Sequence, residues 1–303
     1  MKIEKILIII ALLALFVFSS AQEAGCGTSD ASRTGIDFVL ISRPNFLNMG
    51  SLLQQGDIFY VGVKIENYDL EERTGTICIR DDIDDSFAGI RSSGFGECQP
   101  FVVRAGEREE SSGGFLGLTG SSGGISPGTV EIFFPQQTEY FYNGMPEMAR
   151  PYTANLFVSL QYNEMTQATA TVTSPGTEQP VMGQDPAAVR VSATKTIHPR
   201  TDGYKLDLDI DLIKQTVGQI FLPDFSRGNF TQFHISLIPL TLQCTVSGDP
   251  IEGGVIELED IRKVKCSTTI FNRQEQSFPL VVSLAYGVQL EKKFGFNIKT
   301  ERD

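Results

Sequence analysis

Few residues of this 303-residue chain have the types and spacing that catalysis requires. Gly120-Ser121-Ser122-Gly123-Gly124 matches the G-x-S-x-G pattern, which in hydrolases holds a nucleophilic serine on a sharp turn between a strand and a helix. Here the pattern lies inside a Gly/Ser-rich loop, and a Ser-His-Asp triad would have to use His198 or His234. His234 lies between Phe233 and Ile235 on an expected strand, where an imidazole usually has a structural role. The sequence therefore predicts no catalytic residue and no enzyme.

Acidic side chains gather at two places in the chain, and calcium takes about six to eight oxygen ligands from such groups. Segment 81–85 carries the first group in an expected turn. The candidate calcium ligands are Asp81, Asp82, Asp84 and Asp85. The alternative interpretation is a solvated acidic turn at the end of a strand, and no other cofactor is expected.

The second acidic run, Asp207, Asp209 and Asp211, begins like the calcium loop of an EF-hand. Leu212 stands where that loop needs a glycine. Apolar and polar residues alternate strictly through 204–212, which predicts a strand with one face in the core and the acidic face in water. Like charges at every second position repel one another, so this face is expected to prefer cations or basic partners.

The cysteines divide into two pairs and one remainder. Cys78 and Cys98 fall in the first half of the chain, Cys244 and Cys266 in the second, and Cys26 is left near the N-terminus. A zinc site is the alternative, but no C-x-x-C spacing occurs and the chain has only 2 histidines. Each disulfide would close a loop of about 20 residues and contribute roughly 3 kcal/mol in the chain-entropy model. Paired cysteines predict an oxidising compartment outside the cytoplasm.

Residues 1–25 have the outline of a signal peptide or membrane anchor, because lysines precede an uncharged apolar run at 6–18. About 13 apolar residues make a helix of roughly 20 Å, short of the ~30 Å hydrocarbon core, which favours a cleaved segment over a permanent span. Small residues fit cleavage before Gln22, whereas the sequence ending at Cys26 resembles a lipoprotein signal in which that cysteine is lipidated. Residues 26–35 are then expected to form a flexible tether.

Composition limits the classes of partner. Apolar residues make up 41% and charged residues 20%, which is typical of a globular chain, and the abundance of Phe, Val, Ile and Thr favours strands. A net charge of −12 repels phosphates and anionic lipid heads. No nucleic-acid partner is therefore expected, and membrane contact is expected through the N-terminus only. The N-x-[ST] sequon at Asn229 is a candidate glycosylation site for an exported chain.

Two segments share one pattern, Val158-Ser159-Leu160-x-Tyr162 and Val282-Ser283-Leu284-x-Tyr286. Each is expected to open a hairpin, over 156–173 and 280–298, that closes a domain. This repeat, together with a usual size of roughly 100–200 residues per domain, predicts two domains. The expected boundaries are 36–174 for the first domain, 175–186 for a Pro/Gly-rich linker and 187–303 for the second domain.

Short apolar segments with period-two alternation follow one another through both expected domains. About seven short antiparallel strands per domain fit an immunoglobulin-like sandwich, although the tryptophan of antibody domains is absent. The predicted fold class is all-β, with two consecutive immunoglobulin-like β-sandwich domains after an N-terminal signal or anchor helix.

The pattern Leu53-x-x-Gly56-x-x-Phe59-x-Val61-x-Val63-x-Ile65-x-Asn67, followed by Gly75-Thr76-Ile77-Cys78-Ile79, is similar to the opening domain of membrane-anchored secreted proteins of small-genome archaea. Leu242-x-Cys244, answered by Val264-x-Cys266, resembles their second domain. The resemblance spans most of 36–298 and implies two immunoglobulin-like domains behind a membrane or lipid anchor, with no assigned reaction. Members of this group often carry cysteines where Gln161 and Thr173 stand here.

Together these observations predict a non-enzymatic, exported cell-surface protein that is tethered to the membrane and serves as a structural or adhesive envelope component. One alternative is a self-assembling subunit of an extracellular filament or surface layer, built through edge strands and donation of segment 27–41 between copies. Another is a calcium-dependent binding module. The expected partners are other cell-surface or envelope proteins, or the chain itself.

Overall fold

The computed structural model describes residues 35–91, 96–108, 125–136, 139–146, 150–184, 187–251 and 253–300. Thr34–Asp303 form one compact unit. The described residues form strands, turns and one short 3-10 helix, Asp85–Phe87, so the prediction of an all-β fold is confirmed. The expected N-terminal helix at 1–25, almost all of the tether, and Cys26 lie outside the described residues. None of the helices in the described part of the chain has the length and apolar character to span a membrane.

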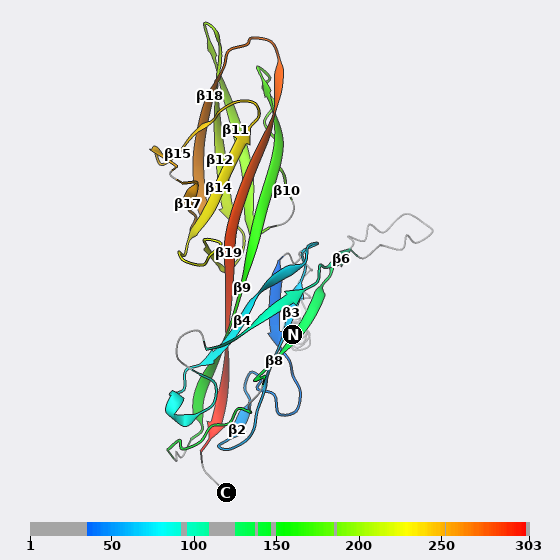
Figure 1. The fold of residues 1–303 in the computed structure, drawn as a ribbon, viewed down its shortest axis with the longest axis vertical. Helices are drawn as coiled ribbons and strands as arrows, with labels where there is room; N and C mark the ends of the chain where they lie inside the picture. Colours follow the sequence, from blue (N-terminus) through cyan, green and yellow to red (C-terminus); the bar gives the residue numbers. More distant parts are fainter. Residues whose placement is uncertain are drawn as a thin grey trace, which may run out of the picture. The chain divides into compact units, whose positions relative to one another are not determined.

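Two long strands organise the fold (Figure 1). Strand β9 (Tyr152–Ser174) and strand β19 (Gln276–Lys299) pair antiparallel along almost their whole length, from Ser174 opposite Gln276 to Tyr152 opposite Ile298. Both expected hairpins are therefore wrong, because 156–173 and 280–298 each lie within one continuous strand. The shared sequence pattern marks two strands that pair with each other rather than two copies of one motif.

Period-two alternation explains why both segments are strands. Every second residue of β9 is buried from Ala154 to Ala168, and every second residue of β19 from Phe278 to Leu290. Successive side chains of a strand point to opposite faces of the sheet, so this pattern presents one face to the core and the other to solvent. The pairing buries one face of a continuous two-stranded ribbon.

The first half of the fold packs a three-stranded sheet against one end of this ribbon. The small sheet has the order β1-β3-β8, and its bounds are Ile36–Leu40, Val61–Asn67 and Gly128–Phe134. Beside β9 the large sheet continues through β4 (Arg73–Asp81) and β5 (Glu97–Val103). Side chains that are completely buried here include Phe38, Val63, Ile77, Val158 and Leu160.

The second half packs a five-stranded sheet against the other end of the ribbon. That sheet has the order β11-β12-β18-β15-β16, with bounds Val189–Arg200, Gly203–Lys214, Ile261–Ile270, Gln243–Val246 and Asp249–Pro250. The ribbon is widened here by β14 (Phe230–Leu237), β17 (Val255–Glu257), β13 (Gln219–Phe221) and β10 (Gly183–Gln184). In a fourth, two-stranded sheet, β6 (Glu107–Arg108) pairs with β7 (Ile125–Ser126).

The alternation that predicted a strand at 204–212 is confirmed by β12. Leu206, Leu208, Ile210 and Leu212 are buried, whereas the aspartates between them are half-buried or exposed. Local hydrophobic pattern alone was sufficient here, because the inward positions are uniformly apolar.

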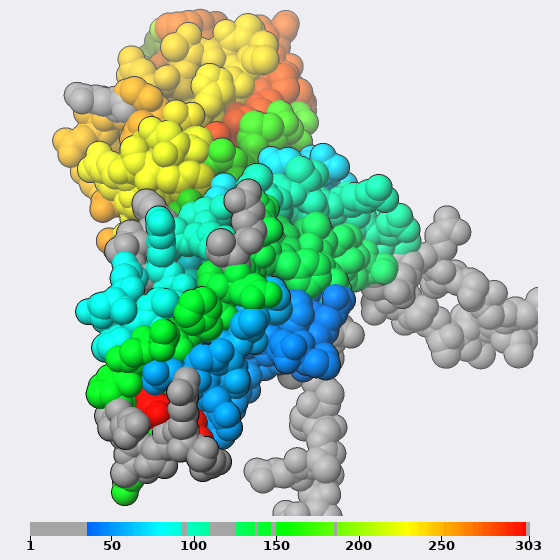
Figure 2. All heavy atoms as spheres, turned by 60° about the horizontal axis from the view of Figure 1, so that its bottom comes forward, coloured from blue at the N-terminus to red at the C-terminus, as the bar shows by residue number. Residues whose placement is uncertain are grey.

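Neither half is made from one continuous segment of chain. The end of β19 pairs in parallel with β2 (Leu52–Gln54), so the C-terminal residues lie within the half that contains the N-terminal strands. Figure 2 shows these red residues beside blue and green ones. The expected linker 175–186 contains β10, which pairs with β9 at Ala168 and Thr169. The two halves are therefore joined by β9 and β19 themselves.

Candidate functional site

Both expected disulfides are present in the structure. Cys78 and Cys98 lie directly opposite each other on β4 and β5, and Cys244 and Cys266 on β15 and β18, each pair with a Cα–Cα distance of 4.0 Å. Each bond therefore joins neighbouring strands of one sheet, unlike the sheet-to-sheet disulfide of antibody domains. Two disulfides indicate an oxidising, extracellular environment.

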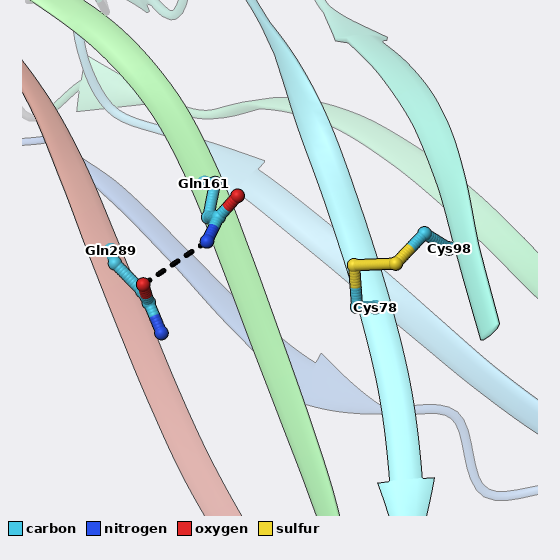
Figure 3. Close-up of a disulfide and its surroundings, with 4 residues drawn as sticks. All are labelled: Cys78, Cys98, Gln161 and Gln289. Atoms are coloured by element: carbon cyan, nitrogen blue, oxygen red, sulfur yellow. Dashed lines mark hydrogen bonds between the residues drawn. A yellow bond between two sulfur atoms is a disulfide. The ribbon is translucent and has the colours of Figure 1, made fainter. Parts of the chain in front are cut away.

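The first disulfide lies on the outer face of the large sheet, near an amide pair (Figure 3). On this face the side-chain amide of Gln161 on β9 donates to Oε1 of Gln289 on β19, at 3.0 Å. This hydrogen bond joins outward positions of the two neighbouring strands.

The acidic turn 81–85 uses its carboxylates as acceptors for groups of the protein. Asp81 is buried and accepts from the backbone N–H of Ile83 (3.0 Å) and the hydroxyl of Tyr142 (2.6 Å). Burial raises the pKa of Asp81 to about 6. Asp82 accepts from the backbone and side chain of Asn155, and Asp84 accepts from the N–H of Ser86. The described residues contain no group of three or more His, Cys, Asp or Glu placed to hold a metal, and calcium stays a prediction.

The other predicted site residues do not assemble into a catalytic arrangement within the described part of the chain. His198 Nε2 lies 3.1 Å from Asp207 Oδ2, and His234 is exposed on β14. Segment 120–124 lies outside the described residues. Asn229 is exposed in the turn before β14, which is an accessible place for a glycan, and its modification stays a prediction.

A buried ionic group lies where the two halves meet. Arg73 on β4 lies 3.0 Å from Asp69 and 3.9 Å from Glu164, an inward residue of β9. The carboxylate of Glu164 also accepts from the backbone N–H of Ala188, in the segment that leads into β11, at 3.1 Å. Burial raises the pKa of Glu164. Glu164 therefore contacts a residue of the first half, Arg73, and a residue of the second half, Ala188. The sequence pattern did not predict this ionic contact.

The two outer faces of the second half differ sharply in charge. On the five-stranded sheet, Asp209 lies opposite Lys265 and Asp211 opposite Lys263. Lys205 Nζ contacts Asp207 at 2.8 Å. The acidic face that was expected to attract basic partners thus neutralises itself with neighbouring lysines. It is a charged, solvated surface of the ordinary kind.

The opposite outer face has a stretch whose residues include no Asp, Glu, Lys or Arg, bordered by Glu257 of β17, which lies on the same face opposite Phe230. This stretch is formed by the outward-pointing residues of β9, β19 and β14, at positions that alternate with the buried ones. We call this surface the uncharged face. Its residues are Asn163, Met165, Gln167, Thr169, Thr171, Thr173, Ser277, Pro279, Val281, Ser283, Ala285, Gly287, Gln289, Gln232, His234 and Ser236.

A shallow hollow of about 500 Å³ crosses the uncharged face. Its lining includes the small residues Ser283 and Ala285 on β19, with Met165 on one side and Gln232 and His234 on the other. Met165 has 64% of its surface exposed. The sequence prediction missed this surface, because both long strands were expected to fold back as hairpins.

The uncharged face is limited by an aromatic side chain near Gly287. A Cβ atom at this position would lie 2.7 Å from the ring of Phe225, so only glycine lets the ring approach the strand. Phe225 itself has a positive φ of 57° in the loop after β13. The ring therefore covers β19 at this point, and the exposed part of the face extends from there toward Thr173 and Ser277.

Comparison with known proteins does not assign the chain to a family. No protein-family model and no curated protein matches the chain. The similarity to anchored proteins of small-genome archaea therefore remains a resemblance of motifs. The structure places those motifs in β2, β3 and β4 and around the two disulfides.

Proposed function

We propose that the chain is a non-enzymatic, exported cell-surface protein that works as a structural or adhesive component of the envelope. The observation that carries this proposal is the uncharged face of a molecule whose net charge is −12. A small-molecule site is typically a concave pocket that surrounds its ligand. A broad face with a shallow hollow suits contact with another macromolecule instead.

Two further features support the location outside the cell. The disulfides require an oxidising compartment to persist, and residues 1–25 have the pattern of a signal peptide or anchor. We propose other envelope proteins as partners, and the N-terminus as the only part that contacts the membrane. The negative charge opposes binding to nucleic acid.

The finer architecture belongs to the same proposal. Each half packs two sheets face to face around buried apolar residues, which supports an immunoglobulin-like arrangement in both. We propose that each half resembles an immunoglobulin domain in its two facing sheets. We do not propose that the halves fold independently, because β9 and β19 belong to both. An experimental structure in which either half lacks two facing sheets would contradict it.

Cell fractionation with thiol labelling tests the proposal. The full chain, expressed in a cell that exports proteins, should be found in the envelope fraction and released by detergent. Alkylation without reduction should leave Cys78, Cys98, Cys244 and Cys266 unlabelled. Recovery in the cytosol with these four thiols alkylated would overturn the proposal.

Lysine substitutions identify the surface that holds the protein in the envelope. Thr171→Lys, on the uncharged face, should weaken retention after the membrane is dissolved in mild detergent, because it places a charge in the contact. Thr194→Lys makes the same change at an exposed strand position on the charged outer face and is the matched control. Equal retention of both variants would contradict a role for the uncharged face.

A further inference from the structure

We infer that the uncharged face binds a second copy of this chain in a two-fold symmetric dimer. The inference rests on the proposed function and names the partner of the surface. It depends on three features of the described residues, which are blocked sheet edges, a surface free of repulsive charge, and an area sufficient for a weak dimer.

The edge of β1 is blocked by side chains of the same chain. Antiparallel pairing with β3 leaves the backbone groups of Phe38 pointing to the open edge. The N–H of Phe38 donates to Asp37 Oδ1 at 2.8 Å, and its carbonyl accepts from Lys292 Nζ at 2.6 Å. Lys292 also pairs with Asp37, at 2.5 Å. These bonds occupy both backbone groups of Phe38, which another strand would need at the middle of this edge.

Two glutamine side chains form hydrogen bonds with the edge backbone of β11, as a neighbouring strand would. The side-chain amide of Gln179 accepts from Lys195 N at 2.7 Å and donates to Lys195 O at 3.2 Å. Gln184 accepts from Val191 N at 2.7 Å and donates to Val189 O at 3.4 Å. Both glutamines lie in the stretch that was expected to be a linker, and they occupy the backbone positions that edge pairing would use.

The remaining long edges carry similar obstacles. Gln99 donates to Phe133 O of β8 at 2.9 Å, and Arg262 donates to Glu257 O of β17 at 2.7 Å. Strand β5 contains Pro100, which has no N–H to offer. Edge strands without free backbone groups do not recruit further strands. These contacts argue against assembly by edge pairing, and β1 already pairs within its own chain instead of being donated to a neighbour.

The uncharged face is a surface where two copies can meet without repulsion between like charges. Each copy carries a net charge of −12, so close contact through charged surfaces is repulsive unless charges are matched. The uncharged face avoids this cost, and its amides and hydroxyls can form hydrogen bonds with the same groups of a second copy. Its small residues on β19 also allow close approach of two sheets.

The size of the face predicts weak association. From Ser277 to Ala285, the part of the face that Phe225 leaves exposed, the strands extend roughly 30 Å, and three strands span roughly 14 Å, which gives on the order of 400 Å² per copy. The total buried area is then about 800 Å², in the range of weak and transient contacts, so we expect an affinity of about 0.1 to 1 mM. In a two-fold interface the same residues meet each other, and the row His234, Ser283 and Gln167 lies near the middle of the face.

Sedimentation velocity of the full chain in density-matched non-ionic detergent tests the inference, from about 1 μM to about 1 mM. The wild type should shift from the mass of one copy to that of two. Gln167→Lys and Gln167→Glu should each lower the association constant at least about tenfold, because like charges then meet across the axis. An equimolar mixture of these two variants should restore association. Thr194→Lys and Thr194→Glu, on the charged outer face, should leave it unchanged.

Two results would overturn the inference. One is a wild-type protein that keeps the mass of a single copy at all concentrations. The other is an equal loss of association in the Thr194 variants, which would place the contact elsewhere. A single-copy protein that is nevertheless retained in the envelope with both disulfides intact would leave the proposed function standing. A cytosolic location with free thiols would remove that function independently of the mass.

Discussion

At the scale of single residues, Asp81 shows how burial sets the properties of a carboxyl group. Its side chain has 1% of its surface exposed and accepts a hydrogen bond from Tyr142. The tyrosine ring is stacked between Phe59 and Phe296, at centroid distances of 5.1 and 6.1 Å. Loss of hydration outweighs the hydrogen bonds and raises the pKa of Asp81 from 3.8 to about 6.

This raised pKa predicts a pH dependence of stability. Between about pH 4 and pH 6 the folded protein keeps a proton on Asp81 that the unfolded chain has lost, so the free energy of unfolding falls as the pH rises through this window. Asp81→Asn should remove this slope, with a difference from the wild type that grows by about 3 kcal/mol toward pH 7. Urea unfolding at four pH values from 4 to 7 measures it.

The control for Asp81→Asn is Asp202→Asn, in the exposed turn between β11 and β12. It removes one negative charge without touching a buried carboxyl group. Parallel stability curves for the wild type and Asp81→Asn would show that Asp81 is ionised in the folded protein throughout, contrary to the prediction.

The sequence predicted the contacts of single residues only where chemistry fixes the type of partner. A cysteine outside the cytoplasm pairs with another cysteine, and two well-spaced pairs left little choice. The partners of Asp81 were not recognisable, because Tyr142 lies 61 positions further along the chain. The acidic turn therefore suggested calcium, whereas the fold supplies protein donors to three of its carboxylates.

At the scale of elements, the hairpin error has a specific cause. Glu164 and Lys292 stand at inward positions of β9 and β19, where alternation requires apolar residues. A charged residue at an inward position interrupts the apolar alternation that identifies a strand. Both are satisfied by distant groups, Glu164 by Ala188 N and Arg73, and Lys292 by Asp37. Strand β12 has no such interruption, and its prediction was correct.

The blocked edge of β11 gives a prediction at this scale. The double variant Gln179→Ala/Gln184→Ala removes four side-chain hydrogen bonds to the edge backbone. It should lower the free energy of unfolding by roughly 2–4 kcal/mol, at about 1 kcal/mol per bond. The freed edge should also promote aggregation. Urea unfolding measures the first effect, and light scattering during heating measures the second.

Gln243→Ala is the matched control, because Gln243 is an exposed glutamine on β15, in the same sheet. It should change neither the urea midpoint nor the onset of scattering. A double variant that behaves like this control would mean that water replaces both amides at no cost and that the edge of β11 is protected by another feature.

At the scale of the whole molecule, the path of the chain decides how the halves depend on each other. Strand β9 leaves the first half and enters the second, and β19 returns from the second into the first. The sequence indicated two packed halves but not this exchange, since pairing between residues more than 100 positions apart leaves no local pattern. The protein therefore has two packed halves and a single pair of strands that supports both.

Phe296→Ala tests this dependence. Phe296 lies near the C-terminus, yet its ring is 1% exposed and stacks on Tyr142 in the half that contains the N-terminal strands. The variant should lose roughly 3–5 kcal/mol. Hydrogen exchange measured by mass spectrometry should accelerate most in residues 36–162. Phe271→Ala, at a site with 75% of its surface exposed, should leave exchange unchanged. Unchanged protection of 36–162 in Phe296→Ala would mean that the first half folds without the returning strand.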